Sequence, residues 1–274
     1  TMVKVKLFVY YDEKYPTNWL SDKVAEQIVS FLEKRNFEVI DASNLKRVLT
    51  EYAGKPHSEE AVVVFARDVL PDLVLDNPAN PSANSPLRRY LNAGHTVVWL
   101  GDIPLYYVGS SDGTKRNLPS NACQIVLGIN PAQHLGSYHR VKLTQYGLMY
   151  GLPVWAGRRP HPPGATMAGI EIIPLALSRH GNQVLYHGFI ASYARSSFSG
   201  FIRIYDFVMD KPIAQEYLEA LHAIAVMRSP ITYLLDKIRE LSERLETKFN
   251  TLKSEVDSLA EYLKRTYGQT ESKH

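Results

Sequence analysis

The last segment of the chain constrains the fold most. From Ile231 to Tyr267 the sequence contains neither glycine nor proline, so nothing in it interrupts a helix. Its apolar residues are three or four positions apart, which is a heptad pattern with one eleven-residue step from Ile238 to Phe249. The segment predicts one helix of about 50 Å. Its apolar seam consists of Leu234, Ile238, Leu241, Leu245, Phe249, Leu252, Val256, Leu259 and Leu263.

A narrow apolar seam of this length must be covered. Either the helix folds back on its own domain, or it associates with other copies. Self-association is the better interpretation, because the charges beside the seam are numerous and balanced, whereas a docking helix usually has a broader apolar face. We therefore expect a coiled coil over residues 229–267, a homo-oligomer, and a disordered tail at 268–274.

The first 228 residues predict an α/β domain. Short apolar runs alternate with helical patterns, which indicates βαβ units and a doubly wound, mainly parallel sheet of the flavodoxin-like type. Residues 104–165 form an irregular excursion that is too long for a simple connection. Four helices are expected: one with Thr17 as its N-cap, one that begins at Ser43, and two that span 87–93 and 212–226. The expected strands are 3–11, 37–40, 61–65, 72–75, 96–100, 125–127, 170–177, 183–190 and 201–207.

The net charge of +3 conceals a basic middle third. Between Gly113 and Tyr205 there are nine lysines and arginines and one acidic residue, Glu171, whereas the residues before Gly113 are slightly acidic. Such an asymmetry is typical of contact with phosphate groups, although the arginines could instead pair with the acidic first part of the chain.

Part of this charge lies in a loop that cannot be helical. In the run Arg158-Arg-Pro-His-Pro-Pro-Gly164 the prolines remove backbone donors and favour extended conformations, so both arginines should project from a stiff loop. Basic side chains beside aromatic rings are typical of phosphate or nucleic-acid surfaces. The candidate residues for this surface are Arg140, Lys142, Trp155, Arg158 and Arg159.

A second candidate site lies where the predicted strands end. In open α/β sheets ligands bind beyond the carboxyl ends of the strands, where the strand order reverses. Asp12, Arg67 and Asp102 follow three predicted strands. The two carboxylates could share a crevice and hold a cation or a ribose. Alternatively, Asp12 caps a turn and Asp102 opens a loop, which are routine roles for aspartate.

One segment resembles a known superfamily. The run Leu87-Arg-Arg-Tyr-Leu-Asn-Ala-Gly-His-Thr-Val-Val-Trp-Leu-Gly-Asp102 is similar to the helix, glycine turn and strand of class I glutamine amidotransferase-like proteins, including the ThuA-like members. The resemblance covers residues 3–130 and implies a flavodoxin-like fold. It does not extend to catalysis, because Cys123 lacks flanking glycines, no His-x-Glu follows, and His95 replaces the second glycine of the turn.

The sequence also limits the function classes. It contains no Gly-x-Gly-x-x-Gly loop, Walker A motif or Gly-x-Ser-x-Gly elbow, and its histidines lack zinc-site spacing. No catalytic residue, metal or cofactor is therefore assigned. The single Cys123, the short apolar runs and the absence of signal-peptide organisation in Val3–Asp12 predict a cytoplasmic protein without a membrane span. The leading expectation is a non-catalytic binding or scaffold protein; a nucleic-acid-binding protein and a hydrolase of sugars or nucleotides are the alternatives.

Overall fold

The computed structural model describes residues 4–55, 59–193, 198–227 and 230–267. The chain separates into two compact units, Thr1–Pro230, here called the body, and Ile231–His274. The expected disordered tail at 268–274 lies outside the described residues.

The body is built on a mixed sheet of eight strands. Five parallel strands come first, in the spatial order β2 (Glu38–Ile40), β1 (Lys4–Tyr10), β3 (Glu59–Phe65), β5 (Thr96–Leu100) and β13 (Phe201–Ile204). The antiparallel strands β12 (Gln183–Ser192), β11 (Glu171–His180) and β9 (Lys142–Leu143) extend the same sheet. The parallel part has an order compatible with a flavodoxin-like fold, and the sheet that we expected to be mainly parallel has five parallel strands and three antiparallel ones at one edge.

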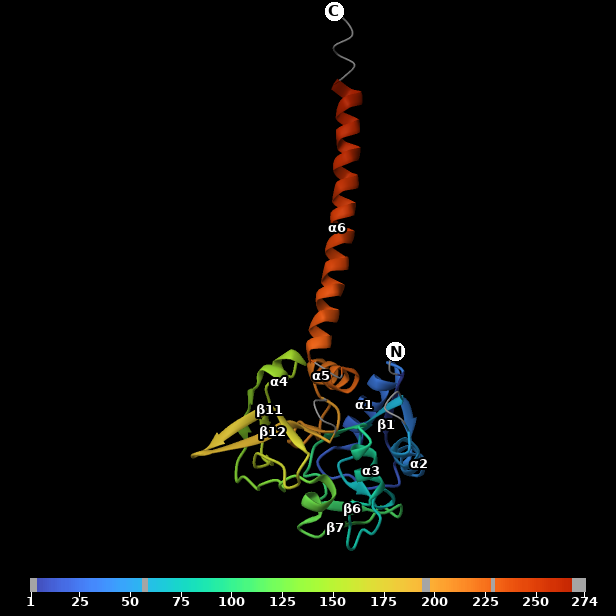
Figure 1. Ribbon diagram of the computed structural model, residues 1–274. Coiled ribbons are helices and arrows are strands. Elements are labelled where there is room, and N and C mark those ends of the chain that lie inside the picture. The colour runs from blue at the N-terminus through green and yellow to red at the C-terminus, as the bar shows by residue number, and fades with distance from the viewer. Residues whose placement is uncertain (1–3, 56–58, 194–197, 228–229, 268–274) are drawn as a thin grey trace, which may run out of the picture. The chain divides into compact units, whose positions relative to one another are not determined.

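Helices cover both faces of this sheet (Figure 1). On one face α1 (Asp22–Glu33) and α5 (Gln215–Val226) pack against the even-numbered residues of β3 and β5, including Val64 and Val98. On the other face α2 (Ala42–Ala53) and α3 (Pro86–Asn92) pack against the odd-numbered residues. The alternation of side chains along each strand thus supplies two separate apolar cores.

The first helix begins later than the sequence pattern predicts. Ser21 rather than Thr17 caps α1, and its side chain accepts a hydrogen bond from the Val24 amide. The Thr17 hydroxyl instead donates to the Leu20 carbonyl and to Asp68. A long-range contact with Asp68 therefore replaces the local cap.

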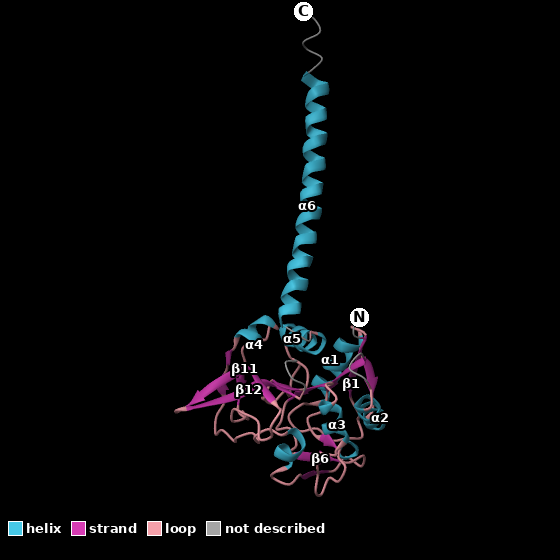
Figure 2. Cartoon of the chain, in the orientation of Figure 1, coloured by secondary structure: helices cyan, strands magenta, loops and turns pink. Residues whose placement is uncertain are grey.

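The excursion after β5 forms small elements of its own (Figure 2). It contributes β6 (Tyr107–Gly109), which pairs with β4 (Leu70–Pro71), and β7 (Lys115–Asn117), which pairs with β6. It also contributes a ladder of β8 (His139–Arg140) with β10 (Ala156–Gly157). It also contains the short helix α4 (Gln145–Met149). Two predicted strands are wrong. Most of 72–75 is the 3-10 turn η1 (Asp72–Val74), and 125–127 belongs to the π-helical turn η2 (Cys123–Leu127).

The second unit contains one helix, α6 (Pro230–Tyr267). Its side chains are described from Ile238 onward, so the predicted seam residue Leu234 has a described backbone but lies outside the described side chains. No helix in the described part of the chain combines the length and apolar character that crossing a membrane requires.

Candidate functional site

The carboxyl ends of the parallel strands bring four acidic or basic positions to one edge of the sheet. Asp12 follows β1, Arg67 and Asp68 follow β3, and Asp102 follows β5. The strand order reverses between β1 and β3, which is where doubly wound proteins usually bind ligands. The residues at this edge are therefore the first place to look for a site.

The reversal point itself is occupied by the protein's own contacts. Asp12 accepts hydrogen bonds from the backbone amides of Lys14, at 3.0 Å, and Ala42, at 3.1 Å. The Arg67 side chain is 2% exposed; its Nε donates to the Asp12 carbonyl at 3.2 Å and its guanidinium pairs with Asp22. Asp12 thus caps the start of α2, and Arg67 closes the space beside it.

Asp68 organises the neighbouring loop. Its carboxylate accepts hydrogen bonds from the Thr17 hydroxyl and from four backbone amides, which belong to Asn18, Trp19, Leu20 and Asp102. Gly101, at a φ of +85°, passes so close that a Cβ there would lie 2.7 Å from Asp68 Oδ2. Asp68 therefore fixes the loop carrying Trp19 against the end of β5.

Asp102 is buried and has a different set of partners from Asp12. One carboxylate oxygen accepts from the Ile103 amide at 2.7 Å, and the other accepts from the Asn18 side chain. Burial raises the pKa of Asp102, and the negative charge of Asp68 adds to this rise, whereas the two hydrogen bonds oppose it. Asp12 and Asp102 thus have separate partners, two backbone amides for Asp12 and the Ile103 amide with the Asn18 side chain for Asp102. The crevice shared by the two carboxylates stays a prediction.

The β8–β10 ladder has one exposed face and one buried face, and each nearby residue of the basic region lies on one of them. Val141 and Trp155 are adjacent in the ladder and both are buried, whereas the paired residues Arg140 and Ala156 are exposed. Directly opposed residues of an antiparallel pair share a face, and faces alternate along each strand. Trp155 is 4% exposed and cannot stack on a ligand, so its inclusion in the predicted phosphate surface is wrong.

A buried polar network anchors the loop that follows β10. Asp206, just after β13, accepts hydrogen bonds from Trp155 Nε1 at 2.7 Å, from the Arg159 amide at 3.0 Å and from His187 Nδ1 at 2.6 Å. Its backbone carbonyl accepts from the Arg158 amide at 3.1 Å. Gly157 is required here, because a Cβ would lie 1.9 Å from Asp206 Oδ1. The arginine-bearing loop is therefore held rigidly at the edge of the sheet.

The same network contains a Ser–His–Asp chain. Ser178 and His187 Nε2 are 2.8 Å apart, and the opposite ring nitrogen bonds to Asp206. His187 reaches this position because it is the unpaired residue of a bulge between β11 and β12. A serine nucleophile must be reachable by substrate, yet Ser178 is 6% exposed. The chain therefore supports the loop and is not assigned a catalytic role.

Arg158 and Arg159 both lie within about 6 Å of one indole ring. Their guanidinium carbons are 5.9 and 5.3 Å from the centre of Trp19, and Arg158 is also 5.3 Å from the ring of Tyr138. Within the described residues neither guanidinium forms an ion pair. We call these four residues the arginine site. Burial and the adjacent Arg158 charge lower the pKa of Arg159.

A cavity of about 390 Å³ adjoins the arginine site. Tyr106 and His134 line it, and their rings are 5.9 Å apart. Arg159 donates from one terminal nitrogen to the carbonyl of Leu135, the residue after His134, at 3.3 Å, so the arginine lies beside this wall of the cavity. Burial lowers the pKa of His134, and the charge of Arg159 lowers it further. The remaining wall comes from Ile103, Pro104, Leu105, Asn117, Leu118, Pro119, Ser120, Cys123, Pro131 and Ala132.

The five predicted anion-binding residues therefore do not form one surface in the structure. Arg158 and Arg159 share the arginine site, exposed Arg140 lies in the adjoining ladder, exposed Lys142 belongs to β9 of the main sheet, and Trp155 is in the core. The sequence pattern missed Trp19 and Asp206. A signal for Asp206 existed, since it follows a predicted strand in the same way as Asp102.

The thiol and the acidic groups give no sign of metal or nucleophilic chemistry. Burial raises the pKa of Cys123 to about 12, which disfavours the thiolate at neutral pH. Among the described residues, no group of three or more His, Cys, Asp or Glu side chains could hold a metal ion.

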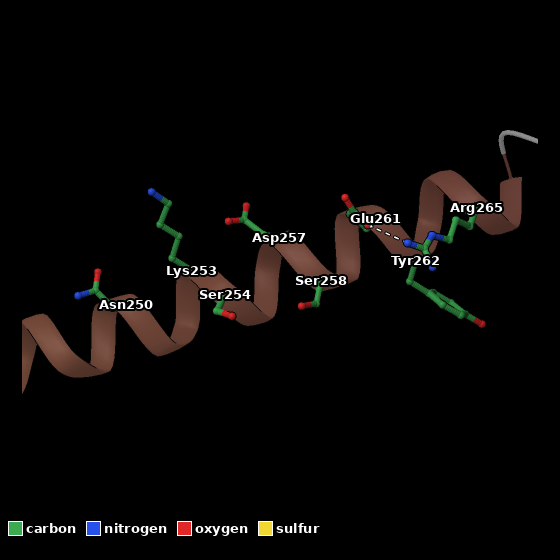
Figure 3. A pocket seen from close by; sticks show the side chains of 8 residues that line it. All are labelled: Asn250, Lys253, Ser254, Asp257, Ser258, Glu261, Tyr262 and Arg265. Atoms are coloured by element: carbon green, nitrogen blue, oxygen red, sulfur yellow. Dashed lines mark hydrogen bonds and ion pairs between the residues drawn. The ribbon is translucent and has the colours of Figure 1, made fainter.

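The apolar seam of α6 is exposed along its described length. From Ile238 to Leu263 its eight described side chains are 45–69% exposed. The opposite face of the helix carries polar side chains, including Asn250, Ser254, Asp257 and the ion pair Glu261–Arg265 (Figure 3). Within its own unit, α6 therefore has an apolar face and a polar face, and the apolar one is uncovered.

The comparisons with known proteins place the chain in a family. Residues 5–228 match the MJECL34 family, so the chain belongs to it. "Uncharacterized protein MJECL34" of Methanocaldococcus jannaschii is 43% identical over 267 residues, covering 94% of this chain and 88% of the relative. That coverage requires the alignment to continue past residue 228 into α6. Among solved structures, a putative ThuA-like protein of Bacteroides uniformis is similar with a TM-score of 0.40 at 11% identity, over 84% of this chain and 95% of that chain.

Proposed function

We propose that this member of the MJECL34 family is a non-catalytic binding or scaffold protein whose copies are joined by α6 in a coiled coil. The observation that carries the proposal is the exposed seam: eight large apolar side chains on one face of one helix, each 45–69% exposed. Leaving such a continuous stripe in water is costly, and monomeric proteins rarely do so. The stripe is therefore an association surface.

A second copy of the chain is the occupant that fits best. The partner must match a narrow seam along roughly 40 Å of helix, and another α6 does so by construction. Two copies would bury sixteen seam side chains at roughly 100 Å² each, on the order of 1,600 Å², which is the size of a standard stable interface. Between Ile231 and His274 the basic and acidic residues are equal in number, so copies do not repel one another.

The test compares two faces of the same helix in the full-length protein. Leu245→Asp with Leu252→Asp places two charges in the seam, and Asn250→Asp with Ser254→Asp places the same charges on the polar face of Figure 3. Sedimentation equilibrium should give a multiple of the chain mass for the wild type and the polar-face variant. The seam variant should have the mass of one chain. A single-chain mass for the wild type, or an unchanged mass for the seam variant, contradicts the proposal.

A specific observation favours a second function, the binding of phosphate-bearing ligands, including nucleic acid, at the arginine site. The Arg158 guanidinium carbon is 5.9 and 5.3 Å from the centres of two aromatic rings and has no carboxylate partner among the described residues, and Arg158 lies two positions after Ala156, which pairs with Arg140 on the exposed face of the ladder. Desolvated guanidinium groups beside aromatic rings suit phosphates and bases. Oligomerisation would then raise the avidity for a polymeric ligand.

This second function predicts binding that weakens as salt concentration rises, because phosphate contacts release counterions. Fluorescence anisotropy with a labelled single-stranded oligonucleotide and with pyrophosphate as competitor measures it. Binding that is insensitive to salt, or to Arg158→Gln with Arg159→Gln, argues against it. Hydrolysis in the strand-end crevice has no comparable observation in its favour, since separate backbone amides occupy Asp12 and Asp102.

Two broader points belong to the same proposal. The order of the parallel strands supports a relationship with the amidotransferase-like superfamily, in a form without its catalytic residues. The single cysteine is buried, and burial raises the pKa of its thiol. A lone free cysteine fits a cytoplasmic protein.

A further inference from the structure

The arginine site and the 390 Å³ cavity are neighbours with complementary chemistry. The cavity is within the range of small-molecule sites, and most of its wall is apolar, with Asn117, Ser120 and His134 as polar exceptions. The arginine site supplies concentrated positive charge beside it. One ligand with an anionic end and a weakly polar end would satisfy both.

Hydrogen bonds within the protein hold Arg158 and Arg159 in place without a ligand. Backbone hydrogen bonds to Asp206 fix both residues, and Arg203 donates to the Arg159 carbonyl from beneath. Among the described residues the Arg158 guanidinium forms no hydrogen bond; its Nε is buried, so its terminal nitrogens are the donors that a ligand can reach. Arg159 uses one nitrogen on the carbonyls of Leu135 and Arg158. Unused guanidinium donors on a rigid loop match the oxygens of a phosphate group, which also relieves the repulsion between the two cations.

The other charges near the site do not oppose this arrangement. Asp102 is an acidic group whose charge influences both Arg159 and His134, but Asn18 and the Ile103 amide already occupy its oxygens. Lys115 binds the other end of the same asparagine side chain at 2.6 Å and adds a third cation to this edge of the sheet. The net field at the mouth therefore favours an anion.

We propose that the arginine site and the cavity form one binding site for a small phosphate ester, with its phosphate held by Arg158 and Arg159 and a flat organic group of nucleoside size inside the cavity. The inference rests on the proposed phosphate binding and narrows its ligand. A small ester is favoured over a nucleic-acid strand because a cavity of small-molecule size lies beside two arginines of one loop. The rings of Tyr106 and His134 give a flat group surfaces to contact.

Isothermal titration of the full-length protein with AMP, adenosine and pyrophosphate tests the two halves of the site separately. AMP should bind at least about 10-fold more tightly than adenosine, because charge-assisted hydrogen bonds to phosphate are strong. Arg158→Gln with Arg159→Gln should weaken AMP and pyrophosphate binding by about 10-fold or more. The exposed Arg179→Gln is the matched control and should leave both unchanged.

A second pair of variants isolates the cavity. Ala132→Phe places a ring in the cavity and should weaken AMP by about 10-fold while leaving pyrophosphate unchanged, as expected when a ligand's organic part loses its pocket. The matched control is Ala83→Phe at an exposed loop position. Circular dichroism of all variants confirms that the fold is retained.

The outcomes separate this inference from the function on which it rests. If neither AMP nor pyrophosphate binds, phosphate binding itself fails. If pyrophosphate binds but AMP gains nothing over it, or Ala132→Phe leaves AMP unaffected, the cavity is not part of the site and only this inference fails. Arg140→Ala with Lys142→Ala gives a further test. If this double variant no longer binds a single-stranded oligonucleotide but binds AMP as the wild type does, the result supports the small-ester site. Loss of AMP binding in the same variants overturns it.

Discussion

Large apolar side chains are buried in the body, whereas those of the α6 seam are exposed. In the body, the large side chains of the sheet and its helices are almost wholly buried, as Trp99, Tyr90 and Phe189 illustrate at 0–1% exposure. In α6 the seam from Ile238 to Leu263 is 45–69% exposed. The body therefore obtains its stability from its own residues, whereas an isolated helix in water is marginal without packing. Mutations in the body should therefore change the free energy of unfolding, whereas mutations in the α6 seam should change the mass of the oligomer.

Removing α6 tests this contrast with the largest expected effect. A chain that ends at Met227 should have the mass of a single chain by light scattering, while the full-length protein should have a multiple of it. Its body should unfold at the same denaturant concentration as before, because none of the body's buried side chains is removed. A truncated protein that remains oligomeric would place the association surface in the body and break the comparison.

Within the body, Asp206 should be the most sensitive polar residue. Asp206→Ala removes the acceptor of three side-chain or backbone donors, including the buried His187, and it removes the acidic group that most favours the charge of the buried Arg203. Leaving a buried charge without its compensating partner costs about 3–5 kcal/mol of unfolding free energy. Urea titration measures the loss, and the exposed Asp210→Ala should stay within about 0.5 kcal/mol of wild type.

The mass of the oligomer supplies the contrast in the same experiment. Asp206→Ala should leave the number of associated chains unchanged under native conditions, because the seam is untouched. A variant that both unfolds early and dissociates would show that the body contributes to association.

Elements that depend on contacts between residues close in the sequence could be predicted, whereas those that depend on distant residues could not. Residues 61–65, 96–100 and 231–267 were predicted within a few positions, because local apolar periodicity determines buried strands and long helices. The turns at 72–75 and 125–127 were mistaken for strands because short apolar runs fit either structure.

The candidate site was predicted only in part, for the same reason. Two arginines in a proline-rich run were recognisable, but their anchor joins Trp155, His187 and Asp206, which are more than 15 residues apart in every pairing. Trp155 was assigned to the surface because nothing in its immediate sequence reveals that its ladder neighbour Val141 is also buried. Asp12 and Asp102 follow strands that are separated by β3 in the sheet, and the amide of Ala42 that contacts Asp12 is 30 residues away in the sequence, so this contact becomes visible only in three dimensions.

The pH dependence of the body's stability should show an effect of intermediate size. His161 is buried, its Nδ1 contacts the Asn130 carbonyl at 2.6 Å, and burial followed by the Arg203 charge places its pKa well below 6.5. The unfolded chain accepts a proton below pH 6.5 and the folded one does not, so stability is full above that pH and falls as the pH decreases. The slope contributed by one such residue is about 1.4 kcal/mol per pH unit.

His161→Phe isolates this contribution. The variant keeps a ring beside Phe189 but cannot titrate, so its unfolding free energy should fall less steeply than that of wild type between pH 6.5 and 5. Urea titrations at several pH values give the two slopes. Equal slopes would mean that His161 is protonated in the folded body. The mass of the oligomer should not respond to this substitution, which again separates the two units.

The smallest effect is expected on the polar face of α6. Arg265 contacts Glu261 one helical turn earlier at 3.1 Å, and both side chains are at least 70% exposed (Figure 3). Such exposed pairs contribute about 0.3–0.5 kcal/mol, and salt screens them. Glu261→Gln should therefore shift the thermal melting of the helix signal only slightly, with the shift vanishing at high salt, and should leave the mass unchanged. A large loss of association on this substitution would show that the polar face, rather than the seam, contacts the second copy, because only a desolvated ion pair could matter so much.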